Sequence, residues 1–164
     1  MRIIQTTRSR TLLHWLVLLG AVLLVAHPAA SEIKRVKSQT VYVPAYAHIY
    51  HGNKAASFQL AVTLSIRNTD PAHPITVMAI DYFDTDGKIL NKYLQGDVTL
   101  PPLGSTRYVI KESDKGGGSG ANFIVKWRAD AKVTAPIIET IMIGTASQQG
   151  VSFTSRGEVI EEES

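Results

Sequence analysis

Residues Phe58–Asn68, with the sequence FQLAVTLSIRN, decide the fold that this chain adopts. Every second side chain in this stretch is large and apolar, and the side chains between them are smaller or polar. This two-residue period is typical of a β-strand with one face in a core and the other towards solvent. Burial of five such side chains contributes about 7–15 kcal/mol, which is enough to organise a sheet. The face expected to be buried consists of Phe58, Leu60, Val62, Leu64 and Ile66.

Further strands are predicted on both sides of this stretch, and Gly, Pro or Asp residues mark the turns between them. The clearest turn is Asp84–Gly87, because an Asp-Gly pair between two apolar runs is typical of a β-hairpin. Phe123, Val125 and Trp127 alternate with other residues and are expected to point inward. The additional predicted strands cover residues 39–50, 75–83, 88–94, 98–100, 106–111, 121–129 and 137–143.

These patterns predict an all-β fold. No segment after residue 30 shows the period of an amphipathic helix. Short strands joined by tight turns favour an antiparallel, immunoglobulin-like β-sandwich of about seven to eight strands, preceded by an N-terminal hydrophobic leader helix. Because the chain contains no cysteine, the expected likeness to antibody domains is one of architecture, without their disulfide.

The first 30 residues have the pattern of an export signal. Arg2, Arg8 and Arg10 form a basic start, and Leu12–Ala26 is an apolar run. This run is shorter than the roughly 20 apolar residues that span a bilayer. We therefore expect a signal peptide cleaved near Ala30, with an uncleaved N-terminal membrane anchor as the alternative. Either outcome places the rest of the chain in the periplasm or outside the cell, possibly tethered to the inner membrane if the leader stays.

The sequence after the leader divides into three parts. Residues 31–38 are polar and are predicted to form a linker, and residues 39–157 are predicted to form the β-sandwich domain. Residues 158–164 are predicted to be a frayed acidic tail.

Charge and composition exclude several classes of function. Three of the 17 Lys and Arg residues lie in the leader, so the remainder carries equal numbers of basic and acidic residues, 14 of each. A neutral domain lacks the electrostatic footprint of a nucleic-acid-binding protein. The absence of cysteine excludes thiolate catalysis and cysteine-ligated metal centres.

The glycine-rich segment Gly116–Ala121 has the spacing of a dinucleotide-binding fingerprint. That fingerprint must open a helix, whereas the following residues, NFIVKW, predict a strand, so nucleotide binding is not expected. Ser119 does not fit a nucleophile elbow either, because the position two residues later is Ala121 and not glycine. The segment is interpreted as a flexible hairpin loop or a recognition loop lined by backbone.

His48 and His51 are the one close histidine pair of the sequence. Together with His73 they would supply three imidazoles to copper or zinc outside the cell. A spacing of three places the pair on opposite faces of a strand unless the strand ends between them, as Gly52 would allow. The alternative is that these histidines are exposed or stack beside Tyr46 and Tyr50.

Five stretches of the sequence carry a resemblance to a known family: Val41–Gly52, Leu64–Asp70, Asp81–Lys88, Gly117–Trp127 and Ile141–Gly157. They resemble the uncharacterised bacterial family called domain of unknown function 3124. The resemblance covers nearly the whole chain after the leader and implies an exported or lipid-anchored protein. This chain lacks the cysteine of the anchored members, and the resemblance implies no catalytic residue.

The sequence as a whole predicts an exported, non-enzymatic binding or scaffolding module without a cofactor. Its expected partner is an unknown envelope protein or a small ligand, and a membrane only through an uncleaved leader. The alternatives are a periplasmic copper or zinc binder that uses His48 and His51, and an unrecognised envelope hydrolase. The predicted contact surface combines three segments, Tyr46–His51, Gly116–Asn122 and Gln148–Arg156. Its candidate side chains are Tyr46, His48, Tyr50, His51, Ser119, Asn122, Gln148, Gln149 and Arg156.

Overall fold

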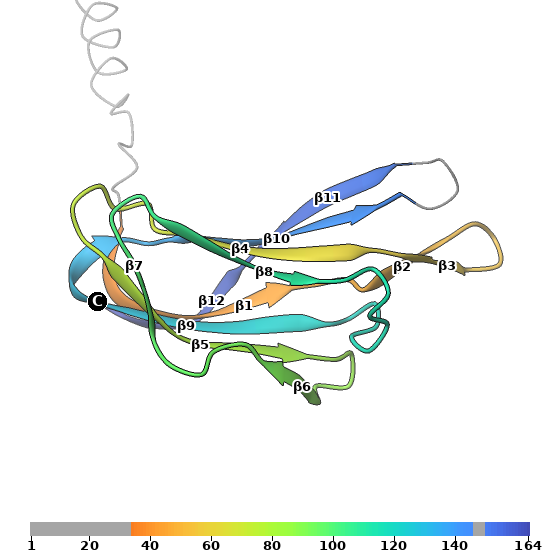
Figure 1. The fold of residues 1–164 in the computed structure, drawn as a ribbon, viewed down its shortest axis with the longest axis horizontal. Coiled ribbons are helices and arrows are strands. Elements are labelled where there is room, and N and C mark those ends of the chain that lie inside the picture. Colours follow the sequence, from red (N-terminus) through yellow and green to blue (C-terminus); the bar gives the residue numbers. More distant parts are fainter. Residues whose placement is uncertain (1–33, 146–149) are drawn as a thin grey trace, which may run out of the picture. The chain divides into compact units, whose positions relative to one another are not determined.

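The structure, a computed structural model, describes residues 34–145 and 150–164. The regular secondary structure of these residues consists of β-strands, and every pairing between the strands is antiparallel (Figure 1). Within the same residues, no helix has the length and hydropathy that a membrane crossing requires. The predicted all-β, antiparallel fold is thus confirmed, while the predicted leader helix lies outside the described residues.

The strands form two large sheets and one separate hairpin. One sheet contains β1 (Arg35–Pro44), β5 (Ile75–Phe83), β6 (Ile89–Lys92), β7 (Val98–Leu100), β9 (Asn122–Thr134) and β12 (Glu158–Glu163). The second contains β4 (Ala61–Arg67), β8 (Ser105–Ile110), β10 (Ile137–Gly144) and β11 (Val151–Arg156). The hairpin is β2 (His48–His51) and β3 (Ala56–Gln59). The six-stranded sheet has the order β12-β1-β9-β5-β6, with β7 also paired to β5, and the four-stranded sheet has the order β11-β10-β4-β8.

Both large sheets contribute to one hydrophobic core (Figure 1). Leu60 and three alternate residues of β4 are fully buried, as the two-residue period predicted. The same holds for the three side chains of β9 that were expected to point inward. Each sheet therefore presents one apolar face to the other. These residues are Leu60, Val62, Leu64, Ile66, Phe123, Val125 and Trp127.

The prediction of one continuous strand over Phe58–Asn68 is wrong, because the structure divides this stretch between β3 and β4. This division is one reason why the structure has more strands than the expected seven to eight. The backbone N–H of Leu60 donates to Ala47 O at 2.9 Å, between the end of β3 and the start of β4. Before this point the chain pairs with β2, and after it the chain pairs with β8 and β10. Phe58 therefore lies in the hairpin and is only partly buried.

The predicted linker and the predicted tail also need correction. β1 begins at Arg35, inside the linker predicted for residues 31–38, and Val36 is fully buried opposite Val133. Residues 158–164 are not a frayed tail, because Glu158–Glu163 form β12 and pair with β1. All six residues of β12 are exposed, so the strand has no alternation of buried side chains from which it could be predicted.

Candidate functional site

Two of the predicted contact segments meet just after β1 ends. The N–H of Ala45 donates to Ala121 O at 2.8 Å, and the N–H of Ala47 donates to Gly118 O at 2.9 Å. Both alanine side chains are fully buried, so the chain is held here by backbone bonds and by packing. These bonds attach the glycine-rich loop to the segment that leads into β2.

The third segment joins through an aromatic contact. Tyr46, between the two anchored alanines, packs edge to face against Phe153 of β11, with ring centroids 5.7 Å apart. Such a pair contributes roughly 0.5–1.5 kcal/mol beyond its buried area. We call the resulting cluster of Ala45–Ala47, Gly117–Ala121 and Phe153 the junction. Each of the three predicted segments therefore contributes at least one residue to the junction.

The glycine-rich loop is also clamped from the turn between β5 and β6. Thr85 donates to Gly117 O from its N–H at 3.0 Å and from its hydroxyl at 3.1 Å. The same hydroxyl accepts the N–H of Gly120 at 3.0 Å. A loop with these contacts on one side and the junction bonds on the other is anchored, which argues against the interpretation as a flexible hairpin loop.

Gly117 is required by a close approach and not by its backbone angle. A Cβ at this position would collide with the hydroxyl of Tyr82, which lies directly beneath the loop. Within the described residues, that buried hydroxyl has no hydrogen-bond partner. Burial raises the pKa of Tyr82, and nearby Asp114 adds to the effect. Burial therefore favours the neutral form of this phenol.

Next to the junction, β2 and β3 form a hairpin with exposed aromatic side chains, which we call the aromatic hairpin (His48–Gln59; Figure 1). Tyr50 is 59% exposed, and its ring packs edge to face against His48 with centroids 5.0 Å apart. His51 packs in the same way against Phe58, at 6.1 Å. Both histidines therefore pack against aromatic rings. His48 packs against a tyrosine, as the alternative to metal binding expected, whereas His51 packs against a phenylalanine.

The structure does not bring His73 to the other two histidines. Its ring nitrogen Nδ1 lies 3.1 Å from Asp70 Oδ1, in the loop between β4 and β5. His48 lies beyond the opposite end of β4, which has seven residues and spans roughly 20 Å. In the part of the chain that the structure describes, no group of three or more His, Cys, Asp or Glu side chains is placed to hold a metal ion.

The remaining predicted side chains lie in different places. Ser119 is half-buried within the loop, and Asn122 begins β9, opposite Pro44 of β1. Arg156 is exposed and lies three residues from Phe153, on the opposite face of β11, so it is not part of the junction. Gln148 and Gln149 lie outside the described residues.

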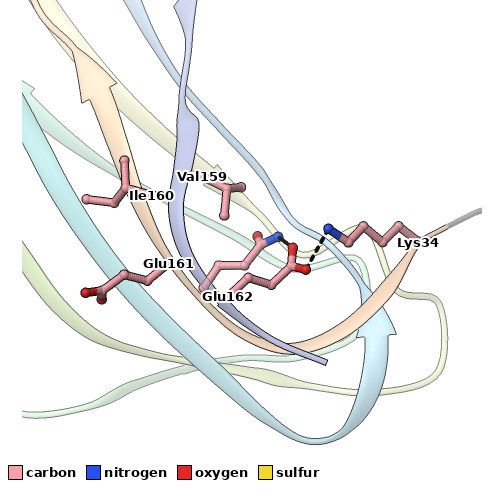
Figure 2. A pocket seen from close by; sticks show the side chains of 6 residues that line it. Lys34, Val159, Ile160, Glu161 and Glu162 are labelled. Carbon is pink, nitrogen blue, oxygen red and sulfur yellow. Dashed lines mark hydrogen bonds and ion pairs between the residues drawn. The ribbon is translucent and has the colours of Figure 1, made fainter.

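A concave region of about 370 Å³ lies beside β12, where its polar side chains meet β1 (Figure 2). Glu162 pairs with Lys34 Nζ at 2.6 Å and accepts a hydrogen bond from Gln39 Nε2 at 2.8 Å. The bond from Lys34, and next that from Gln39, lower the pKa of Glu162. On the neighbouring residue, Glu161 accepts the hydroxyl of Thr40 at 2.8 Å.

These polar groups satisfy one another, so the concave region is interpreted as the attachment of β12 to β1 and not as a ligand site. Sequence reasoning missed the attachment. The available signal was the run of donors Ser38, Gln39 and Thr40, which is matched by a run of acids, Glu161–Glu163, at the other end of the chain.

The described part of the chain is all-β, and the polar and aromatic groups of the candidate site lie in the junction and the aromatic hairpin. The chain belongs to the family described as "Protein of unknown function (DUF3124)", whose model matches residues 38–160. This confirms the family suggested by the five stretches of sequence. No curated protein matches the chain.

One solved structure is similar to the chain, a Thermotoga maritima protein described as "Crystal Structure of Thermotoga maritima 1070". The two are 13% identical, and the match covers 77% of this chain and 97% of the other, with a TM-score of 0.46. A likeness of this size carries no argument about function.

Proposed function

We propose that this protein is an exported, non-enzymatic binding or scaffolding module of the bacterial envelope. Its contact surface is formed by the junction and the aromatic hairpin, and its partner is an envelope protein or a small ligand. The observation that supports this proposal is that three segments distant in sequence attach to one another beside an exposed tyrosine, Tyr50.

The chemistry of the surface suits recognition. Tyrosine offers a large, stiff ring with a polar tip, and it is enriched among the residues that dominate binding energy at protein interfaces. Tyr50 already packs against His48, so little conformational freedom remains to be lost when a partner covers it. The bonds of Ala45 and Ala47 fix the base of this surface. A fixed base beneath a protruding ring favours specific binding.

The proposed architecture is an immunoglobulin-like sandwich in which β1 and β10 have exchanged places relative to the immunoglobulin strand order. In immunoglobulin domains, strands A, B, E and D form one sheet and strands C, F and G form the other. Here β4 pairs with β8 as B does with E, and β5 pairs with β9 as C does with F. The place of G beside F is taken by β1, and the place of A beside B is taken by β10.

Export is supported by the leader pattern of the sequence and by the position of β1. Cleavage near Ala30 would fall a few residues before Arg35, where β1 begins, so removal of the leader leaves every described strand intact. An uncleaved leader would instead tether the same domain to the inner membrane.

Photo-crosslinking in living bacteria tests this function. A benzophenone amino acid at position 50 is expected to give a discrete adduct in the envelope fraction, because Tyr50 lies at the proposed contact. The matched control carries the same group at Leu103, an exposed apolar residue in the loop between β7 and β8, beside Asp70 and away from the junction. A His48→Ala change is expected to weaken the adduct at position 50, since it removes the ring against which the side chain at that position packs.

Two results would contradict the proposal. The first is an identical set of adducts from positions 50 and 103, which would indicate nonspecific collision. The second is recovery of the protein from the cytoplasmic fraction with its leader intact, which would refute export.

A further inference from the structure

The outer face of the four-stranded sheet, turned away from the core, carries rows of side chains that the proposed function does not use. Directly paired residues of an antiparallel sheet point to the same side, so the strand register defines each row. One row crosses all four strands, and each of its side chains is either aliphatic or a threonine, which presents a methyl group. It consists of Thr154, Ile141, Thr63 and Val109.

The next row towards the aromatic hairpin continues this apolar surface. Ile143 lies opposite Ala61 on β4 and opposite Ser152 on β11. Val109 is 54% exposed and Ile143 is 47% exposed, so a contiguous apolar area faces solvent. Singly exposed apolar residues are normal on a protein surface, but adjacent rows of them mark an interaction surface.

The row on the other side is basic. Arg156, Glu139, Ser65 and Arg107 occupy it in register. Arg67 lies two residues further along β4, and its Nε donates to Ser65 Oγ at 3.1 Å. This bond directs the Arg67 side chain back across the basic row, over Ser65, which is only 5% exposed. We call the two apolar rows together with these arginines the outer arginine face.

The positive charge of this face is not balanced locally. Three arginines share it with one carboxylate, Glu139. Among residues 34–145 and 150–164, none of the three guanidinium groups forms an ion pair. The acidic residues gather elsewhere, with four glutamates on β12 at the edge of the other sheet. A domain with balanced total charge thus presents one basic, partly apolar side.

We propose that the outer arginine face binds the surface of an anionic phospholipid membrane. The three guanidinium groups contact lipid phosphates, which they match in geometry. Ile141, Ile143 and Val109 lie against the boundary between headgroups and acyl chains. Basic and apolar side chains on one face are the combination by which proteins bind at the membrane interface.

Charge complementarity favours this partner over a second copy of the chain. Two copies joined through the same face would place arginines against arginines, which is unfavourable. An acidic protein would match the charge as well, and the experiment below separates it from a membrane. Each arginine near an anionic bilayer strengthens binding about fivefold, so the three together account for about 100-fold.

The absence of cysteine provides a direct test on the full chain. A Thr154→Cys change places a single thiol on the outer arginine face for an environment-sensitive fluorophore, and Asn91→Cys on β6 serves as the control. With phosphatidylglycerol vesicles, the label at position 154 is expected to brighten and shift to the blue, and the label at position 91 to stay unchanged. Phosphatidylcholine vesicles are expected to give neither response, and high salt to reverse the first.

Charge variants sharpen the test. The triple variant Arg67→Gln, Arg107→Gln and Arg156→Gln is expected to need about 100-fold more lipid for the same response. The matched variant Lys88→Gln, Lys92→Gln and Lys115→Gln loses the same charge away from this face and is expected to respond like the parent. If the arginine variant does not fold, the responses of the labels at positions 154 and 91 to the two lipids still test whether this face binds an anionic membrane.

Several outcomes would overturn the proposal. One is equal brightening at positions 154 and 91, or with both lipids, because the leader alone could produce that. Another is no response to vesicles together with a response to polyglutamate, which would assign the face to an acidic protein. An arginine variant that is folded and binds like the parent would also overturn it.

Discussion

Replacement of Trp127 by alanine is expected to lower the free energy of unfolding by about 3–5 kcal/mol. Trp127 is among the largest fully buried side chains in the described part of the chain, and it packs in the core to which both sheets contribute. Alanine would leave a cavity that the strands around it cannot close. Phenylalanine is expected to cost less than half as much, because it fills most of the space. It also removes an indole N–H that is buried without a hydrogen-bond partner in the described residues.

Urea denaturation of the full chain measures this effect. Met78→Ala serves as the control, because Met78 lies on β5 and is partly exposed, and its replacement is expected to change stability by less than about 1 kcal/mol. A Trp127→Ala protein as stable as the control would contradict the assignment of this tryptophan to the core.

The second large effect is expected at Asp70, whose carboxylate joins the loop between β4 and β5 to the end of β9. It accepts the N–H groups of Ala72 at 2.9 Å, of His73 at 2.9 Å and of Thr134 at 3.1 Å. These bonds, that of Ala72 foremost, hold the pKa of Asp70 well below its usual value of 3.8. Asp70→Asn would leave these three backbone N–H groups with a poorer acceptor, and the melting temperature at neutral pH is expected to fall by several degrees.

The pH dependence follows from the direction of the pKa shift. The folded protein keeps the Asp70 carboxylate ionised at a pH where the unfolded chain already takes up a proton. Its stabilising contribution is therefore complete above about pH 5 and is lost as the pH falls below about 4. Thermal unfolding of the parent and of Asp70→Asn is expected to differ most at neutral pH and least in acid.

Asp86→Asn, in the exposed turn after β5, is the matched control and is expected to unfold like the parent at neutral pH. If Asp70→Asn and the parent lost stability in parallel as the pH fell, the ionised carboxylate would not be the group that holds this loop.

The parts of the fold that sequence could predict are those in which one strand face is buried. Leu60, Val62 and Leu64 alternate with smaller residues because β4 is an interior strand with one face in the core. The same rule fails for β12, where no side chain is buried and the strand is held by polar contacts to β1. Those partners lie more than 120 positions away in the sequence, so no local pattern contains them.

The candidate site divides in the same way. Composition alone singled out Tyr46–His51 and the glycine-rich loop, because these segments contain more polar and aromatic residues than turns require. Their contact depends on the bonds from Ala45 and Ala47 to the loop, which are made by backbone atoms and leave no trace in residue type. The basic row of the outer arginine face likewise depends on the register of β11, β10, β4 and β8, which sequence alone does not specify.

Amide hydrogen exchange at Ala45 and Ala47, measured by NMR on the full chain, tests most directly whether the three segments form one surface. Both amides are expected to exchange slowly, and the rings of Tyr46 and Phe153 are expected to show cross-relaxation. Amide exchange at Ala47 as fast as at Lys54 in the exposed hairpin turn, without cross-relaxation between the rings of Tyr46 and Phe153, would contradict the claim that the three segments form one surface.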